Sequence, residues 1–380
     1  MTEEVQNALS SIISQFAILG RAGLITPHGS GHIHDTYHVK NAFPAEPDYL
    51  LQRINHHVFK NIPALMENIQ LVTEHLRARL RDIPGAQPDR EVLTLVPTVA
   101  QQWFYRDEAG NYWRMYYFLE DTNSYDLVQL PRQAYEGGKA FGKFQALLAD
   151  LPVNLLHDTI PDFHNVVNRL RLFREAIQAN PKDRVKEVAA EIAFVEERAE
   201  TMSTIYKMGQ QGKLPLRITH NDTKFNNVLL DKWDKALCVI DLDTVMPGYV
   251  AYDFGDAIRT TVNTAPEDEP DLKKIKIDLD LFTAFAQGFL AETSTALTPH
   301  EINSLAPGVL LLPFIMGLRF LTDYIGGDTY YKIYFATHNL QRARAQFQLV
   351  RVLEVHYDHL TKIIKEVAQA AYPVEAGAKI

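Results

Sequence analysis

The chain has 380 residues, 46% of them hydrophobic and 22% charged, and 38 basic against 47 acidic residues give a formal net charge of −9. This composition excludes a disordered chain, and the length favours two lobes over one core. An acidic chain is also a poor general binder of nucleic acid, which needs clustered cations. The one cysteine, Cys238, excludes an intramolecular disulfide and a cysteine-built zinc site. We see no secretory signal and no uninterrupted apolar run of ~20 residues, so we expect a cytoplasmic protein that does not span a membrane.

The first third of the chain is predicted to form a small sheet with helices. Apolar residues at helical spacing predict an amphipathic helix within residues 1–20. The alternation of apolar and polar residues then predicts strands around one further helix: strands at 23–29, 33–39 and 49–55, a helix at about 59–80, and strands at 93–99 and 111–119. The order β-β-β-α-β-β is that of a small twisted sheet with one helix.

From residue 122 onward the pattern is mostly helical, interrupted by two short strand-like runs within 228–242. We place a boundary in the polar stretch 118–126 and expect an N-terminal nucleotide-binding lobe at 1–121 and a C-terminal catalytic and substrate-binding lobe at 122–380. The acidic run 266–271 is interpreted as a solvated loop.

The segment LRITHNDTKFNNVLLD, residues 216–231, contains the spacing His220-x-Asp222-x-Lys224-x-x-Asn227. A second apolar run, LCVID, ends at Asp241. If the two runs pair as a hairpin, Asn227 and Asp241 lie at one end of it and offer the oxygen ligands that Mg²⁺ prefers. This is the layout of a kinase catalytic loop, which predicts an α+β, protein kinase-like bilobal fold.

In such a loop Asp222 would accept the proton of the substrate hydroxyl, and Lys224 would lie near the transferred phosphoryl group. The alternative for Asp222 is a residue that caps a turn. Asp243, on the same face of its strand as Asp241, either supports the site or tethers the loop. We expect His220 to be structural and Cys238 to be a core residue.

The N-terminal lobe is then expected to hold the nucleotide. A small-residue hairpin tip would allow the backbone to approach the phosphates, although a plain turn explains the same residues: Gly29, Ser30 and Gly31. The stretch 117–120, with Phe118 and Glu120, would offer backbone groups to adenine.

Four segments carry a resemblance to a known family: THNDTKFNNVLLD, ALCVIDLDTVMPG, YDFGDAIR and GLRFLTDYIGGDTYY. They resemble the aminoglycoside phosphotransferase and choline kinase group, and within it the bacterial N-acetylhexosamine 1-kinases, over nearly the whole chain. The resemblance implies an enzyme that uses ATP and Mg²⁺ to phosphorylate the anomeric C1 hydroxyl of N-acetylglucosamine or N-acetylgalactosamine, without deciding between the two sugars.

The resemblance also assigns residues. It implies Asp222 as the base, Asn227 and Asp241 as metal ligands, and Lys224 as a phosphate contact. Arg319 and Tyr330 match positions that hold the sugar, and a guanidinium and a tyrosine suit a polyol. Asp253 matches an aspartate that anchors the catalytic loop. Asp256 and Arg259 either pair on a helix or face the sugar, and the paired arrangement is favoured.

One position departs from the wider kinase pattern, in which the third strand carries a lysine for the phosphates. Here Gln52 takes that place, with Arg53 beside it. Either Arg53 points inward, or Lys224 and the metal bind the phosphates without it. The usual glutamate partner on the following helix is Glu67 or Glu74.

Two other functions stay open. One is a kinase of the same group that acts on an amino alcohol or an aminoglycoside, which the negative net charge would suit. The other is a nucleotide-binding regulator without catalysis, which the presence of Asp222, Asn227 and Asp241 disfavours. The sequence does not fix the oligomeric state, and a monomer is the simplest expectation.

Overall fold

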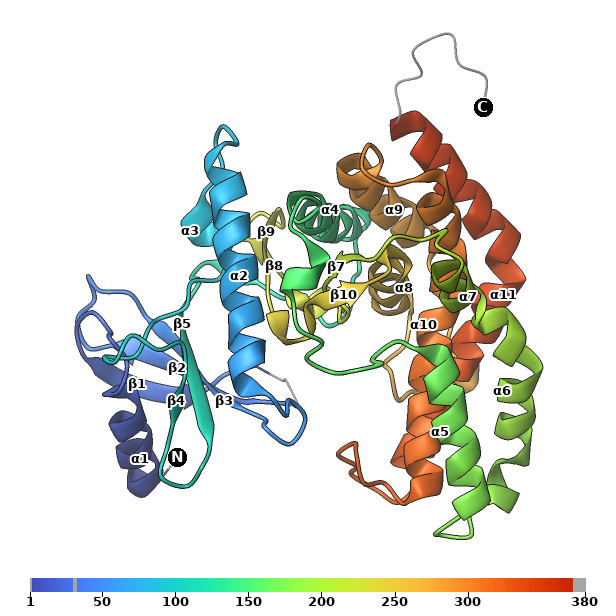
Figure 1. Ribbon diagram of the computed structural model, residues 1–380, viewed down its shortest axis with the longest axis horizontal. Helices are drawn as coiled ribbons and strands as arrows, with labels where there is room; N and C mark the ends of the chain where they lie inside the picture. The colour runs from blue at the N-terminus through green and yellow to red at the C-terminus, as the bar shows by residue number, and fades with distance from the viewer. Residues whose placement is uncertain (1, 30–32, 372–380) are drawn as a thin grey trace. The chain divides into compact units, whose positions relative to one another are not determined.

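The computed structural model describes residues 2–29 and 33–371 (Figure 1). By its internal contacts the chain divides into two compact units. The first unit comprises residues 1–122, 154–160 and 238–245, and the second comprises residues 123–153, 161–237 and 246–380. The segment that ends β9 and carries Asp241 and Asp243 therefore belongs to the first unit.

The first unit is built on an antiparallel five-stranded sheet with the order β1-β2-β3-β5-β4. Its strands are β1 (Ala22–Pro27), β2 (Asp35–Asn41), β3 (Tyr49–Ile54), β4 (Tyr105–Arg106) and β5 (Tyr112–Tyr117). Three helices accompany the sheet: α1 (Glu3–Ile13), α2 (Ile62–Arg81) and α3 (Pro88–Glu91). The apolar stripe of α1 packs with Tyr49, Leu51 and Met115 in one core. Because side chains alternate along a strand, Gln52 and Arg114 belong to the opposite face, where the register pairs them directly.

One strand prediction in this unit is wrong. Residues 93–99 form only isolated bridges, from Leu95 to Tyr116 and from Thr98 to Phe16, and β4 takes the place of the expected strand. Pro97 gives the physical reason, because a proline has no N–H to continue a ladder. Val96 of this run is fully buried although the run is not a strand.

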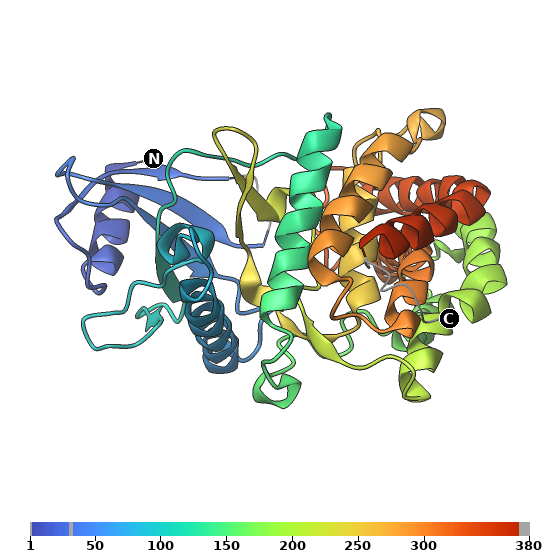
Figure 2. The same cartoon turned by 90° about the horizontal axis from the view of Figure 1, so that it is seen from above.

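The second unit is mostly helical, and α4 packs along α9 in it (Figure 2). Its helices are α4 (Pro131–Leu147), α5 (Val166–Ala179), α6 (Ala189–Met202), α7 (Thr204–Gln210), α8 (Val250–Thr261), α9 (Leu279–Thr293), α10 (Pro299–Gly326) and α11 (His338–Ala371). The long helix α10 packs against α5, α8 and α11. Glycines allow α8 and α10 to touch, because a Cβ on Gly255 would lie 2.2 Å from the carbonyl oxygen of Gly308. Any larger residue there would push α8, which carries the loop anchor described below, away from α10.

Short elements connect the helices of the second unit. β7 (Arg217–Thr219) pairs antiparallel with β10 (Met246–Gly248). β8 (Val228–Asp231) is the middle strand of a sheet with β6 (Thr122–Asn123) and β9 (Ala236–Val239), so the hairpin expected from the sequence is present. The short 3₁₀ turns are η1 (Val153–Leu155), η2 (Val185–Val188), η3 (Phe225–Asn227), η4 (Leu242–Thr244) and η5 (Leu272–Lys274).

Among the described residues, α10 is long and apolar enough to cross a membrane by length and composition, although its apolar residues are interrupted by polar ones. However, 78% of its most apolar window is buried inside the protein. A helix that is apolar all round and covered on its sides is typical of the core of a soluble domain. The α+β prediction, with a sheet-rich and a helix-rich part of a protein kinase-like fold, is confirmed.

Candidate active site

The loop that carries Asp222 is held in place by Asp253, a buried residue of α8. The Asp253 carboxylate accepts the backbone N–H groups of His220 at 2.8 Å and Asn221 at 2.7 Å, and the side chain of Gln145 at 2.5 Å. Its own carbonyl accepts the hydroxyl of Thr223 at 2.6 Å. Burial raises the pKa of this carboxyl. The electrostatic effect of His220 and the hydrogen bonds from the N–H groups and from Gln145 oppose the shift. Asp253 is thus a structural anchor, as the sequence suggested.

The backbone turns sharply just before the candidate base. Asn221 has φ of +64°, a left-handed conformation that asparagine tolerates better than most residues. Its carbonyl accepts the ring N–H of His164 at 2.8 Å. His220 is fully buried between Phe141 and Phe144, and its Nδ1 accepts the backbone N–H of Asp222 at 3.3 Å. His220 is therefore structural, and the loop is fixed on both sides of Asp222.

Asp222 faces a cation and an amide from its own loop. Lys224 Nζ lies 3.2 Å from Asp222 Oδ2, and the side-chain N–H of Asn227 donates to the same oxygen at 3.3 Å and to the Asp222 carbonyl at 2.7 Å. Burial would raise the pKa of the Asp222 carboxyl, but Lys224, then His220, outweigh it and hold the pKa below its usual value. The carboxylate is therefore ionised at neutral pH and 24% exposed, as a proton acceptor has to be.

A second buried carboxylate lies near this loop on α8. Asp256 forms an ion pair with Arg259 at 2.9 Å, which is the paired arrangement that the sequence favoured. Arg259 also binds Glu267 at 2.9 Å. Burial and the negative charge of Asp222 raise the pKa of Asp256, while Arg259 opposes them.

The acidic run 266–271 is a loop with mostly exposed residues, as expected, but several of its carboxylates also form ion pairs. Besides the bond of Glu267 to Arg259, Asp268 binds the ring of His338 at 3.0 Å and Glu269 lies 3.5 Å from Lys274. The run thus joins α8 to the start of α11. The sequence missed this because the partners lie up to 70 residues away.

Arg319, on α10, lies among aromatic rings of the second unit. Its guanidinium carbon is 5.1 Å from the ring centre of Phe163, 5.7 Å from Tyr330 and 5.5 Å from Tyr331. Burial would lower the pKa of Arg319, but Tyr331, Tyr330 and Asp222 raise it. The two residues predicted to hold a sugar, Arg319 and Tyr330, are therefore neighbours, and the charge of Asp222 reaches Arg319.

Three further groups of this region were missed from the sequence. Arg169 donates twice to the carbonyl of Phe163, and burial together with the charge of Arg319 lowers its pKa to about 10. Burial, with Arg319 and Arg169 nearby, lowers the pKa of His164 to about 3, so its ring is neutral. The hydroxyl of Tyr331 is buried without a hydrogen-bond partner. Only the tyrosine pair of GGDTYY could have drawn attention in the sequence.

In the first unit, the cation next to Gln52 comes from the neighbouring strand β5 and is not Arg53. Arg114 of β5 donates through Nε to the side-chain oxygen of Gln52 at 2.9 Å. Its two terminal nitrogens each donate to the carboxylate of Asp243 at 2.6 Å. Arg53 is instead half-exposed and paired with Asp35 across the strands. The buried cation beside Gln52 is therefore Arg114, which holds Asp243 as a loop-tethering residue.

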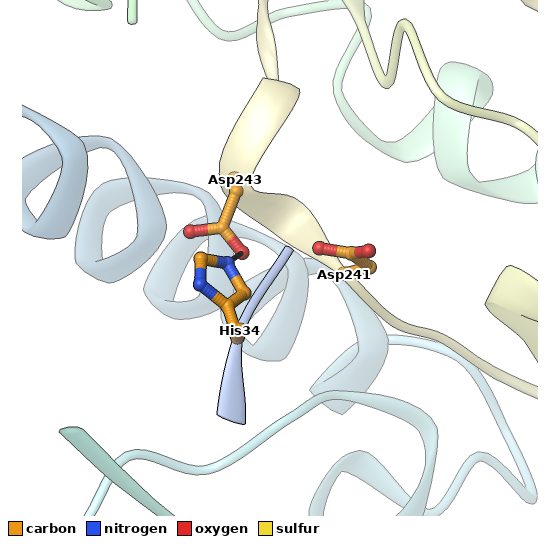
Figure 3. A group of neighbouring side chains, drawn as sticks. All are labelled: His34, Asp241 and Asp243. Carbon is orange, nitrogen blue, oxygen red and sulfur yellow. Dashed lines mark hydrogen bonds and ion pairs between the residues drawn. The ribbon is translucent and has the colours of Figure 1, made fainter. Parts of the chain in front are cut away.

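Asp241, Asp243 and His34 come together in the first unit (Figure 3). One ligand atom from each lies within 4.8 Å of the others, and His34 Nε2 is 3.3 Å from Asp243. Both Asp243 oxygens accept hydrogen bonds, so their charge is already neutralised by Arg114. Asp241 is exposed, in a left-handed conformation with φ of +61°, and its carboxylate suits a hard cation such as Mg²⁺. Of the three, Asp241 fits a metal ligand and Asp243 fits a support.

The structure describes three of the other residues predicted to bind the nucleotide: Gly29, Phe118 and Glu120. Gly29 is exposed with φ of +75°, and Ser30 and Gly31 lie outside the described residues. The N–H of Phe118 donates to the carbonyl of Asp48 at 2.9 Å, and the carbonyl of Glu120 accepts from Arg90 at 2.7 Å.

The two candidate glutamates of α2 have partners of their own. Glu67 binds His157 at 2.9 Å, and Glu74 accepts from Gln70 at 2.8 Å. Each of these partners belongs to the first unit. Neither contact involves a lysine or Arg114.

The profile of the phosphotransferase enzyme family matches residues 24–287, which is more than half of the chain. The chain belongs to the phosphotransferase enzyme family. The match includes the loop from Asp222 to Asn227, the strand end at Asp241 and the anchor Asp253, and it ends before Arg319.

Solved structures agree with the fold of this phosphotransferase. A microcompartment-associated aminopropanol kinase superposes with a TM-score of 0.64 at 16% identity, over 94% of this chain and 98% of the other. A choline kinase from Cryptosporidium parvum Iowa II gives 0.56 at 16% identity, over 98% and 99%. An aminoglycoside phosphotransferase from Alicyclobacillus acidocaldarius gives 0.57 at 12% identity, over 95% of each chain. At such low identity the likeness concerns the fold alone.

Proposed function

We propose that this phosphotransferase is an ATP-dependent kinase of small-molecule alcohols, and that its acceptor is the C1 hydroxyl of an N-acetylhexosamine. The observation that carries the proposal is the pairing of an ionised Asp222 with Lys224 and Asn227 on a loop anchored by Asp253. A partly exposed carboxylate fixed in this way can accept a hydroxyl proton while the adjacent ammonium stabilises a transferred phosphoryl group.

The surroundings of Arg319 support a neutral acceptor rather than a cationic one. The fold neighbours named above are kinases of aminopropanol and choline, whose acceptors are amines or quaternary ammonium compounds. In this chain Arg319 and Arg169 lie close enough for one to lower the pKa of the other. Like charges in a poorly solvated site repel each other, so an ammonium group would be disfavoured there. A polyol can accept hydrogen bonds from a guanidinium and stack on a tyrosine ring.

The chain's own residues would act as follows. Asp222 would take the proton from the acceptor hydroxyl as the phosphoryl group is transferred, and Lys224 would neutralise charge on that group. For Mg²⁺ we keep the two ligands predicted from the sequence, Asn227 and Asp241. The side-chain N–H of Asn227 is turned toward Asp222, so its amide oxygen is turned the other way. When bound, the ion would neutralise the phosphates of ATP. A cytoplasmic location and a monomer are parts of the same proposal.

A panel of acceptors tests the proposal. Purified protein is incubated with ATP, Mg²⁺ and one acceptor at a time, and ADP release is measured. The panel contains N-acetylglucosamine, N-acetylgalactosamine, glucosamine, choline, 1-amino-2-propanol and an aminoglycoside. We expect turnover with the N-acetylated sugars, and the proton-coupled ³¹P spectrum of the product should show coupling to an anomeric proton.

The panel also separates the alternatives. Turnover of choline, aminopropanol or the aminoglycoside in preference to the sugars would replace the sugar proposal by an amine-directed kinase. ATP binding in calorimetry without ADP release for any acceptor would favour a nucleotide-binding regulator. A phosphate on another hydroxyl would keep the sugar class and reject the C1 position.

A further inference from the structure

The segment that follows α10 is attached to that helix by one carboxylate. Asp323, in the last turn of α10, accepts the backbone N–H groups of Thr329 and Tyr330 on Oδ1 and that of Tyr331 on Oδ2, each at 2.9 Å. The side chain of Asn339, at the start of α11, donates to Asp323 Oδ2 at 2.9 Å as well. Four N–H donors thus converge on a carboxylate that is only 7% exposed.

Neighbouring contacts fix the same segment from its other side. α10 ends at Gly326 and is capped by Gly327, whose φ of +103° only glycine adopts readily, and the next residue, Asp328, has φ of +61°. Asp328 pairs with Arg184 at 2.5 Å and accepts the second N–H of Asn339 at 2.9 Å. The turn is therefore defined by side-chain contacts and is not simply a connection between two helices.

A carboxylate at this place is unfavourable for the helix itself. The carboxyl end of a helix carries partial negative charge, so an aspartate in the last turn costs stability. Asp323 offsets this cost through the N–H groups of the following segment. Its presence is explained by what it does to residues 329–331 and not by capping α10.

Asp323 also lies one helical turn beyond Arg319, on the same face of α10. The segment that it holds carries Tyr330 and Tyr331, whose rings lie 5.7 Å and 5.5 Å from the guanidinium carbon of Arg319. Tyr330 is 54% exposed, so its position depends on its backbone and not on burial of the ring. We propose that Asp323 is a positioning residue that sets Tyr330 and Tyr331 over Arg319 and thereby shapes the acceptor side of the site. This inference rests on the proposed function of Arg319 and Tyr330.

The variant Asp323→Asn tests the inference because it keeps the shape and one acceptor oxygen. Its new NH₂ group would face two N–H donors, those of Tyr331 and Asn339 or, after an amide flip, those of Thr329 and Tyr330, so two hydrogen bonds are replaced by contacts between donors. We expect amide hydrogen exchange in a peptide covering residues 329–331 to become roughly tenfold faster. We also expect the KM for the acceptor to rise roughly tenfold, while kcat and the KM for ATP change less than about twofold.

The control is Glu301→Gln, at the other end of the same helix. Glu301 is 1% exposed, caps α10 through Thr298 and forms an ion pair with Arg217. This variant should lower the Tm without changing either KM or the exchange of residues 329–331. If Asp323→Asn does not fold, Asn339→Ala, which removes a donor to both Asp323 and Asp328, should show the same pattern with smaller changes.

Exchange and kinetics separate this inference from the proposed function. Unchanged exchange at residues 329–331 in Asp323→Asn overturns the positioning role, whatever the substrate is. Faster exchange with an unchanged acceptor KM overturns the link to the acceptor. If no compound of the panel is phosphorylated, the proposed function fails while the exchange experiment still reports on Asp323.

Discussion

Arg114 in the first unit is a buried cation and Arg319 in the second is a partly buried one, and their partners differ. Arg114 is 1% exposed and uses Nε and both terminal nitrogens on Gln52 and Asp243. Arg319 forms no ion pair with a carboxylate within the described residues, and three aromatic rings surround it. One of its N–H groups contacts the sulfur of Met316, a weak acceptor, at 3.6 Å, and a hydrogen bond with the Tyr330 side chain contributes to its raised pKa.

The difference separates a structural cation, Arg114, from Arg319, which is proposed to bind the acceptor. A guanidinium that donates to a carboxylate through two parallel bonds has little left for a ligand and mainly stabilises the fold. A guanidinium whose planar faces meet rings keeps its N–H donors for a group that enters from outside. Substitution of Arg114 should therefore affect stability first, and substitution of Arg319 should affect acceptor binding first.

The largest effect is expected for Asp222, the carboxylate whose charge reaches Arg319. Asp222→Asn should lower kcat by roughly three decades, because an amide cannot accept the hydroxyl proton. ATP binding by calorimetry should stay within about twofold of the wild type, since the variant changes the charge of one acceptor-side group. Retained turnover would reject Asp222 as the base.

Arg114→Met should have the next largest effect, on stability. It leaves Asp243 buried without its cation, and breaking a buried pair from one side costs about 3–5 kcal/mol. Urea unfolding measures the loss. The double variant Arg114→Met, Asp243→Leu removes both charges and should recover much of the stability. Equal losses in the single and double variants would show that the loss comes from the missing interactions of the pair itself and not from leaving Asp243 buried without a partner.

Arg319→Ala should change binding more than stability. We expect the KM for the acceptor to rise roughly 10- to 100-fold with little change in the KM for ATP, because one charged hydrogen-bonding group contributes about 1.5–3 kcal/mol. Arg319→Lys keeps the charge but not the planar guanidinium group. Its KM for the acceptor should lie between those of the wild type and Arg319→Ala. A parallel rise in both KM values would contradict an acceptor-specific role and would remove the contrast with Arg114.

The contrast also shows where sequence reasoning succeeds. The Asp222 to Asn227 spacing lies within one loop, so local geometry was enough to predict that these side chains meet. Arg114 was missed because its role depends on the register that sets it opposite Gln52, and register is a property of paired strands. Asp323 was missed because its partners lie beyond the helix end, in a turn whose backbone could not be foreseen. Pro97 could have been used, and it argued against the strand wrongly predicted at 93–99.

The smallest expected effect is on the pH dependence of stability. His164 reports it, because the positive charge of Arg319 helps to lower the pKa of this residue. Burial, Arg319 and Arg169 lower the pKa of His164 to about 3, against an ordinary value of 6.5. The unfolded chain therefore binds a proton before the folded chain does. Stability from this residue is fully present above pH 6.5 and is lost as the pH falls toward about 3, by up to about 1.4 kcal/mol per pH unit.

Urea unfolding of the wild type and of His164→Gln is measured between pH 7.5 and 4.5. The contribution of His164 is the difference between the two slopes of the free energy of unfolding against pH. Glutamine can still donate to the Asn221 carbonyl but does not titrate, so the variant should lose less stability on acidification. In Arg319→Ala the nearby positive charge is gone, the pKa of His164 should rise, and the slope should become shallower. An unchanged slope in Arg319→Ala would mean that burial alone keeps His164 neutral, and that the guanidinium of Arg319 is better screened than its aromatic surroundings imply.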